Sequence, residues 1–246
     1  MTAVFLSDVH LQDASSVKSK IVIRFLQEQA SRFESIFIMG DFFDVWPATS
    51  PYLIEKFEPV LSVLRNLVKC GHRVHYFEGN HDFHLGEYFS NEIGIQVYPG
   101  PSSVEWAGKK IYLAHGDLGN PKEFGYRVLR YVLRRPITKF LIQKTPQKWV
   151  YDLGKRGSTM SRDYQMKSKK REAAIREIYR SSARRILESG YDIVLMGHTH
   201  IPDDFTIDLG SKSGRYINTG DWVKHFSYVE FDGQEFYTRT HPVKSL

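Results

Sequence analysis

Cysteine is almost absent from this chain of 246 residues, and the single Cys70 excludes a disulfide within it. Such sparse cysteine is compatible with a reducing compartment. No uninterrupted apolar run approaches the roughly 18 residues that a membrane-spanning helix needs. No basic segment precedes the strand-like run Ala3-Val4-Phe5-Leu6, so no cleavable signal peptide is expected. We therefore expect a cytoplasmic protein that is soluble or peripheral to a membrane.

Acidic residues are scarce in one part of the chain. Residues 122–185 contain 19 Lys or Arg but only 5 Asp or Glu, a balance of +14, whereas the remainder has a balance of −8. A charge difference of this size indicates a segment that faces an anionic partner. Phosphate groups, nucleic acid and an anionic membrane all fit that description.

Apolar runs and helical patterns alternate through the first third of the sequence. This order is typical of a parallel α/β sheet, in which functional sites lie at the carboxyl ends of the strands. No repeat or linker interrupts the chain, so one domain over residues 1–246 is expected. Strands are predicted at 3–6, 35–39, 73–77, 109–114, 193–196, 205–209, 216–219, 227–231 and 236–240, and helices at 19–33, 53–69, 85–92 and 171–188.

The alternation is interrupted by a basic segment, which we interpret as a helical insertion at about 120–188. In it, aliphatic residues such as Val128 and Leu141 are interleaved with Arg and Lys. Pro136 should divide any helix there, so two short amphipathic helices are expected between 120 and 170.

Each of five predicted strands ends in a polar cluster. In the last cluster, His198 and His200 flank one residue, and period-two alternation would place both imidazoles on one side of the backbone. Asp8 and His10 have the same spacing. Together the strand ends supply Asp8, His10, Asp41, Asn80, His81, His115, His198 and His200.

Without His81, these clusters offer four imidazoles, two carboxylates and one amide oxygen. Nitrogen and oxygen donors without a thiolate suit Mn²⁺, Fe²⁺ or Zn²⁺. Seven ligands exceed one tetrahedral site and suit two ions that share a carboxylate. Two ions about 3.5–4 Å apart can activate water and stabilise a phosphoryl displacement. The other five histidines have no ligand partner in sequence and are interpreted as structural or surface residues.

Five motifs, Asp-Val-His, Gly-Asp-Phe-Phe-Asp, Gly-Asn-His-Asp, His-Gly-Asp and Gly-His-Thr-His, resemble the blocks of the calcineurin-like metallophosphoesterase family. The resemblance covers nearly the whole chain outside the insertion. It implies a four-layer αββα sandwich with a dinuclear metal site at the sheet edge. It assigns one ion to Asp8, His10, Asp41 and His200, and the other to Asp41, Asn80, His115 and His198.

The same resemblance makes Asp41 the catalytic bridge between the ions and His81 a catalytic contact to the phosphate. Three further carboxylates in or near these motifs, Asp44, Asp82 and Asp117, are expected to orient the imidazoles.

The basic insertion and the motif Gly-Asp-Phe-Phe-Asp-Val-Trp are similar to one branch of the family, the bacterial UDP-2,3-diacylglucosamine diphosphatases of lipid A synthesis. That branch implies Mn²⁺, a lipid-linked sugar nucleotide as substrate, and peripheral association with the anionic inner face of the cell membrane. Well-known members carry arginine at the position of His81. The expected substrate contacts are Asn80, His81, Glu123, Arg156, Ser161, Arg162, Lys169 and His198.

Two other functions remain open. A phosphodiesterase of the same family acting on nucleotides or nucleic acid would also use a basic surface. Nucleic acid is the less favoured partner because the insertion is mainly aliphatic, although Tyr126 and Trp149 could stack on bases. A scaffold without metals would have lost at least one ligand, whereas all seven positions hold competent ligands. No protein partner is inferred.

Overall fold

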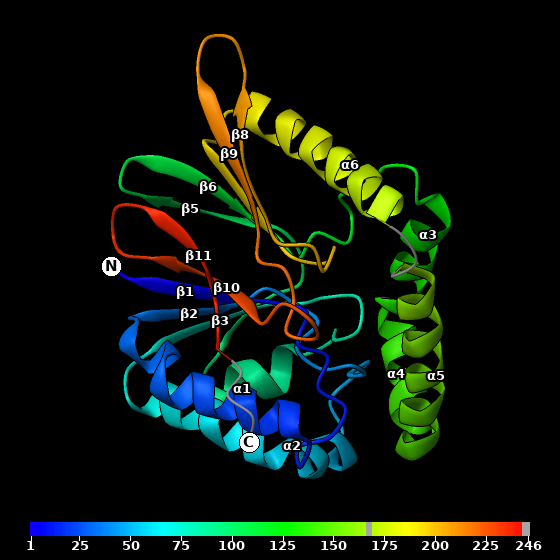
Figure 1. The fold of residues 1–246 in the computed structure, drawn as a ribbon. Coiled ribbons are helices and arrows are strands. Elements are labelled where there is room, and N and C mark those ends of the chain that lie inside the picture. The colour runs from blue at the N-terminus through cyan, green and yellow to red at the C-terminus, as the bar shows by residue number, and fades with distance from the viewer. Residues whose placement is uncertain (166–168, 243–246) are drawn as a thin grey trace.

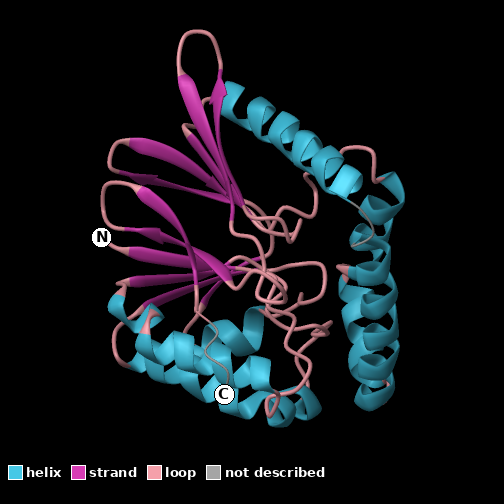
Figure 2. Cartoon of the chain, in the orientation of Figure 1, coloured by secondary structure: helices cyan, strands magenta, loops and turns pink. Residues whose placement is uncertain are grey.

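Two β-sheets lie face to face, and helices cover their outer faces (Figures 1 and 2). The computed structural model describes residues 1–165 and 169–242, without the side chains of residues 159–169. The four-layer αββα sandwich is therefore confirmed. Within the described ranges, no helix combines the length and the apolar character needed to cross a membrane.

The first sheet is parallel on one side of β1 and antiparallel on the other. β1 pairs in parallel with β2, which pairs in parallel with β3, whereas β10 and β11 continue the sheet antiparallel beyond β1. Phe5 of β1 lies opposite Phe37 on one side and Val229 on the other. The order is β11 (Phe236–Thr240), β10 (Ser227–Phe231), β1 (Ala3–Leu6), β2 (Ser35–Ile38), β3 (Arg73–Phe77) and β4 (Gln96–Tyr98).

The second sheet has a parallel centre with antiparallel edges. β6, β7 and β9 run parallel, and β5 and β8 close the two edges. The carboxyl ends of β1, β2, β3, β6 and β7 therefore meet at one edge of the sandwich. The order is β5 (Ser102–Trp106), β6 (Lys109–Leu113), β7 (Ile193–Met196), β9 (Ser213–Asn218) and β8 (Asp203–Asp208).

Three apolar layers hold the sandwich together. Between the sheets, Phe5, Phe37 and Leu195 belong to one fully buried cluster, which explains why these strands read as continuous apolar runs. A second cluster joins the first sheet to α1 (Val17–Glu28) and α2 (Pro51–Lys69). A third joins the second sheet to α6 (Lys169–Glu188).

The helices begin where the sequence supplies caps. The Ser16 hydroxyl accepts the amide of Ser19 at the start of α1. Ser50 accepts the amide of Leu53 in α2, where Pro51 occupies the first turn. α1 ends at Glu28, earlier than predicted, because a 3₁₀ turn over Ala30–Arg32 follows it.

The insertion contains three helices before α6 instead of the two expected over 120–170. They are α3 (Phe124–Leu133), α4 (Pro136–Lys144) and α5 (Gln147–Gln165). Pro136 separates α3 from α4 as predicted, and a second proline, Pro146, precedes the additional helix. In Figure 1 the three form a column facing the loops at the carboxyl ends of the strands.

The structure refines several local predictions. The helix expected at 85–92 is a π-helical turn over Tyr88–Ile93, ended by Gly94 with φ of 88°. The short strands β4 and β5 lie in a stretch for which the sequence predicted only general β character. The parallel pairing predicted for the first third of the chain is confirmed for β1, β2 and β3, and β10 adds an antiparallel neighbour to β1.

Candidate metal centre

Five loops converge at the carboxyl edge of the two sheets. Each follows one strand: β1, β2 and β3 of the first sheet, and β6 and β7 of the second. The loops bring together all eight residues selected from the strand ends. These are Asp8 and His10 after β1, Asp41 after β2, Asn80 and His81 after β3, His115 after β6, and His198 and His200 after β7.

Most of these residues have an unusual backbone conformation. Five of them lie in the left-handed region, which costs a residue with a side chain about 1–3 kcal/mol. His198 and His200 are therefore not extended, and period-two alternation does not determine where their imidazoles lie. The φ angles are 54° at Asp8, 50° at His10, 52° at Asp41, 70° at His198 and 58° at His200.

The first group contains Asp8, His10 and His200. The Nε2 atoms of the two histidines lie 3.2 Å apart, and Asp8 Oδ1 lies 3.5 Å from His200 Nε2. Asp8 and His10 are almost completely buried. Asp8 Oδ1 is buried without a hydrogen-bond donor, and such an atom needs a positively charged or donating partner.

The second group contains Asp41, Asn80, His115 and His198. His115 Nε2 lies 3.4 Å from Asp41 Oδ2, 3.1 Å from Asn80 Oδ1 and 3.2 Å from His198 Nδ1. The other nitrogen of His115 donates to the carbonyl of Met39 at 2.8 Å. That hydrogen bond leaves Nε2 directed at the group.

Asp41 lies between the two groups. Its Oδ2 atom is 3.4 Å from His115 Nε2 and 3.9 Å from His10 Nε2, which belong to different groups. Its Oδ1 atom accepts the amide of His81 at 2.9 Å. Gly79 permits this packing, because a Cβ there would lie 2.1 Å from Asp41 Oδ1.

The spacing of the donor atoms fits two metal ions. Ligands that surround an ion at about 2.1 Å lie roughly 3.0–3.4 Å from one another. The contacts within both groups are close to that range, and Asp8 Oδ1 has no other partner. A third group of His10, Asp44 and His81 is also close enough for an ion. It fits less well, because both oxygens of Asp44 already accept hydrogen bonds.

Burial prepares three histidines to bind metal. It lowers the pKa of His10 to about 3. It also lowers the pKa values of His198 and His200 to about 4. All three imidazoles are therefore neutral at pH 7, as a metal ligand must be.

His81 is held by the backbone of a neighbouring loop. Its Nδ1 lies 2.9 Å from the carbonyl of Asp44 and therefore carries the proton. Its Nε2 lies 4.0 Å from Asp41 Oδ2, and its side chain is 14% exposed. Nε2 therefore faces Asp41, which lies between the two groups, and the side chain is partly accessible.

The three carboxylates expected to orient imidazoles have different partners. Asp44 Oδ1 lies 3.4 Å from His10 Nδ1. Asp117 accepts Tyr126 and Arg130 of α3, at 2.5 and 2.6 Å. Asp82 accepts the amides of Asp41, Phe42, Phe43 and Gly79 and the hydroxyl of Tyr76, so it fixes the loop that carries Asp41 and not an imidazole.

The expected substrate contacts in the insertion are only partly described. Glu123 accepts the side-chain amide of Asn120 at 2.9 Å, and Arg156 is exposed on α5. The side chains of Ser161, Arg162 and Lys169 lie outside the described residues.

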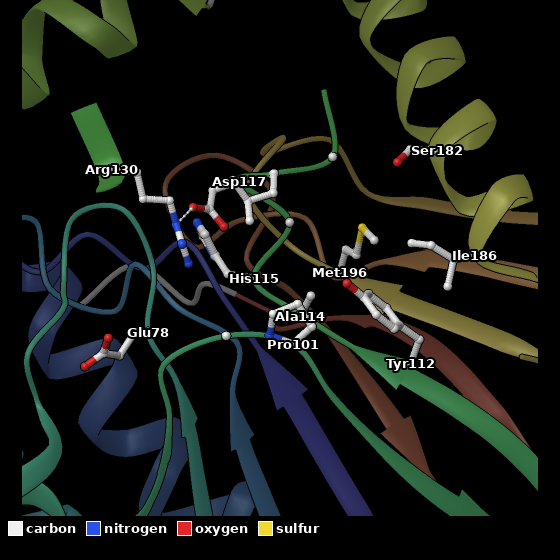
Figure 3. A pocket seen from close by; sticks show the side chains of 14 residues that line it. Glu78, Pro101, Tyr112, Ala114, His115, Asp117, Arg130, Ser182, Ile186 and Met196 are labelled. Carbon is white, nitrogen blue, oxygen red and sulfur yellow. Dashed lines mark hydrogen bonds and ion pairs between the residues drawn. The ribbon is translucent and has the colours of Figure 1, made fainter. Parts of the chain in front are cut away.

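Arg130 and Arg134 were not predicted from the sequence as site residues, yet they join α3 to the loops that hold the candidate ligands. Arg134 pairs with Glu78 at 2.6 Å and donates to the carbonyl of Gly79 at 2.9 Å, next to Asn80. Arg130 pairs with Asp117 beside a cavity of about 80 Å³, which His115 also lines (Figure 3). Two features of the sequence could have indicated these ion pairs. Acidic residues lie two positions from Asn80 and His115, and the arginines of α3 are spaced three or four residues apart.

Residues 1–202 match the sequence model of the calcineurin-like phosphoesterase family. The chain belongs to this family. It is therefore a metal-dependent hydrolase, and the two groups of ligands are candidates for its dinuclear centre.

Curated relatives of this calcineurin-like phosphoesterase include proteins named UDP-2,3-diacylglucosamine hydrolase. The one from Pseudomonas aeruginosa is 27% identical over 94% of this chain and 95% of its own length. The one from Azotobacter vinelandii is 28% identical over 99% and 100%. Among solved structures, a dimetal phosphatase from Danio rerio is 13% identical, with a TM-score of 0.45 over 98% of this chain and 99% of the other.

Metal affinity should rise with pH, because two ligands hold protons in the metal-free protein. Burial raises the pKa of Asp8 to about 8. Burial alone would lower the pKa of His115, but the Asp41 carboxylate outweighs it and raises that pKa to about 10. An ion must displace these protons, so its apparent affinity should increase about 10- to 100-fold per unit between pH 6 and 8.

Calorimetric titration with Mn²⁺ at pH 6, 7 and 8, in two buffers of different ionisation enthalpy, measures both the affinity and the protons released. Affinity that is independent of pH would contradict this protonation of Asp8 and His115.

Proposed function

We propose that this phosphoesterase hydrolyses the pyrophosphate of UDP-2,3-diacylglucosamine to UMP and 2,3-diacylglucosamine 1-phosphate. The names of the full-length relatives support this substrate. Mn²⁺ is the proposed metal for both ions, with Fe²⁺ or Zn²⁺ as alternatives, because the donors are imidazole, carboxylate and amide groups.

A large apolar cavity beside the metal centre carries the proposal. Its volume is about 720 Å³, and it lies between the insertion and the loops that hold Asn80 and His81. Cavities of roughly 300–1,000 Å³ are typical of ligand sites. An acylated sugar nucleotide could place its chains there and its pyrophosphate at the metals. The aliphatic lining comes from Val45, Leu129, Leu133, Leu141, Ile142, Val150 and Leu153.

Charged groups lie where the apolar cavity meets the metal centre. Arg130 and Arg134 line the cavity together with Asn80 and His81. Guanidinium groups suit an anionic diphosphate because their donors match its oxygens in pairs. Both arginines already pair with carboxylates, which fixes their positions before a substrate binds.

Two bound ions would supply an activated water and stabilise charge on the attacking and leaving oxygens. Side chains of the protein would orient the substrate and the proton transfers. His81 Nε2 is directed at the centre by the hydrogen bond from Nδ1 to Asp44, so this atom can contact a phosphate oxygen or hold a proton for the departing group.

The outer surface of the insertion supports association with an anionic membrane. Phe124, Tyr131 and Phe140 are 75%, 60% and 53% exposed, and none of them lines the cavity. Basic residues flank them in the sequence, and Arg135 and Lys144 lie over the rings of Tyr131 and Phe140. Apolar side chains among cations suit an interface with anionic lipid. Retention on anionic vesicles, but not on oligonucleotides, across a salt series tests this part; the reverse result would favour nucleic acid.

The experiment that tests the substrate incubates the Mn²⁺-loaded protein with UDP-2,3-diacylglucosamine in detergent and measures UMP. The same assay with the deacylated sugar nucleotide should show a much higher KM, because nothing fills the cavity. Hydrolysis of an aryl phosphodiester without any release of UMP would refute the proposed substrate and favour a generic phosphodiesterase.

A bulky side chain in the cavity should selectively harm the acylated substrate. Ile142→Trp places an indole in the lining, so kcat/KM for UDP-2,3-diacylglucosamine should fall about 10-fold or more. Hydrolysis of a small aryl phosphodiester should be unchanged. Ile137→Trp is the matched control, because Ile137 lies on the same helix, is 64% exposed and does not line the cavity. Equal loss in both variants would argue against acyl chains in this cavity.

A further inference from the structure

One face of α5 contacts the metal loops directly. Tyr151, Gly154 and Ser158 are spaced by three and four residues, so they share one face of the helix. Tyr151 is 5% exposed and Ser158 is 4% exposed, although most of the insertion is accessible. This face meets the loops that carry His10 and Asp41.

Close packing at the middle of this face requires glycine at position 154. A Cβ at Gly154 would lie 2.6 Å from Cγ1 of Val45, so only glycine allows the helix to approach this closely. At the start of the face, the Tyr151 hydroxyl donates to the carbonyl of Gln12 at 2.6 Å. Both contacts bring Ser158 within reach of the loops.

Ser158 reaches a metal ligand through one carboxylate. Its hydroxyl donates to Asp44 Oδ1 at 2.5 Å, and the same oxygen lies 3.4 Å from His10 Nδ1. The other oxygen of Asp44 accepts the side-chain amide of Gln12 at 2.8 Å. With both oxygens held, Asp44 keeps the imidazole of His10 turned so that Nε2 faces His200.

We propose that Ser158 is a positioning residue of the metal centre, which acts through Asp44 on His10 and so couples docking of α5 to binding of the ion at His10. The proposal rests on the two-ion site of the proposed function and is independent of the substrate. Since coupling is reciprocal, the ion should hold α5 in place as strongly as α5 favours the ion.

Ser158→Ala should lower the affinity for one of the two metal ions and leave the affinity for the other unchanged. Loss of a group that orients a metal ligand typically lowers affinity about 10- to 100-fold. Titration of the metal-free protein with Mn²⁺, followed by calorimetry and electron paramagnetic resonance, should show about a 10-fold loss at one site and a mononuclear spectrum at intermediate loading. Unchanged binding at both sites, or equal loss at both, would overturn the proposal.

Two glycines of α5 allow the effect of helix docking on metal binding to be tested without changing any hydrogen-bonding side chain. Gly154→Ala should displace the helix from Val45 and reproduce the effect of Ser158→Ala on one ion. Gly157→Ala is the control, because a Cβ at this position meets nothing within 4 Å and alanine favours the helix. If both variants bind Mn²⁺ alike, α5 docking has no part in metal binding.

Hydrogen exchange measures the reciprocal effect. Removing metal from the unmodified protein should raise amide exchange in residues 147–158, whereas in Ser158→Ala exchange should be high with or without metal. Exchange that does not respond to metal in the unmodified protein would contradict the coupling. These results hold whether or not UMP is released, so failure of the proposed substrate and failure of this inference are distinguishable.

Discussion

Asp41→Ala should reduce turnover of any phosphoester by at least about 10³-fold, because it removes the one carboxylate that lies between the two groups of ligands. Asp41 Oδ2 is within 4 Å of histidines from both groups, so its loss affects both ions. It also accepts the amide of His81, which would lose this support. Steady-state kinetics together with metal analysis measures the effect.

Asp41→Asn distinguishes the effect of the negative charge from the effect of side-chain volume, because asparagine keeps the volume and removes the charge. We expect it to bind at most one ion tightly and to remain nearly inactive. Asp208→Asn is the control, because Asp208 is an exposed carboxylate on β8 that accepts the amide of Gly210. Near-normal activity of Asp41→Ala with two ions bound would refute the two-metal interpretation.

His81→Ala should lower kcat by about 10²- to 10⁴-fold while both ions stay bound. His81 has the position of a proton donor or phosphate contact: Nδ1 is fixed to the Asp44 carbonyl, and Nε2 is partly accessible at the middle of the site. His81 takes no part in the short contacts between donor atoms that define the two ligand groups. Rapid-mix kinetics with metal analysis distinguishes lost chemistry from lost metal.

The leaving group offers a sharper measurement on the same variant. If His81 holds a proton for the departing oxygen, an aryl ester with a very acidic phenol should lose less rate than one with a weakly acidic phenol. His72→Ala is the control, because His72 binds the carbonyl of Phe33 away from this centre. Loss of metal from His81→Ala would assign this residue to the ligands instead.

The candidate ligand residues could be selected from sequence because their signal is local. Each follows an apolar strand, and parallel strands bring their carboxyl ends to one edge. The conformation of the ligands could not be derived in this way. His198 and His200 were expected to share a side of an extended chain, but both are left-handed and they lie in different groups.

Tertiary contacts account for most of the other differences. Nothing near Asp82 in the sequence indicates that it gathers four backbone amides, since their positions depend on how the loops after β2 and β3 pack. Ser158 lies more than a hundred residues from Asp44, and no local pattern connects them. Pro136 predicted one break in the insertion correctly, but the third helix depends on contacts with Val45 and Gln12 that only the fold creates.

The position of β1 has a consequence for synthesis of the protein. Phe5 pairs with Phe37 on one side but with Val229 on the other, so one edge of β1 has no native partner until β10 has left the ribosome. An unpaired strand edge invites association with other chains during that interval. Asp8 and His10 emerge early, whereas His198 and His200 emerge after the whole insertion. Metal that reaches the nascent chain would therefore meet an incomplete set of candidate ligands, and tight loading would wait for the last third of translation.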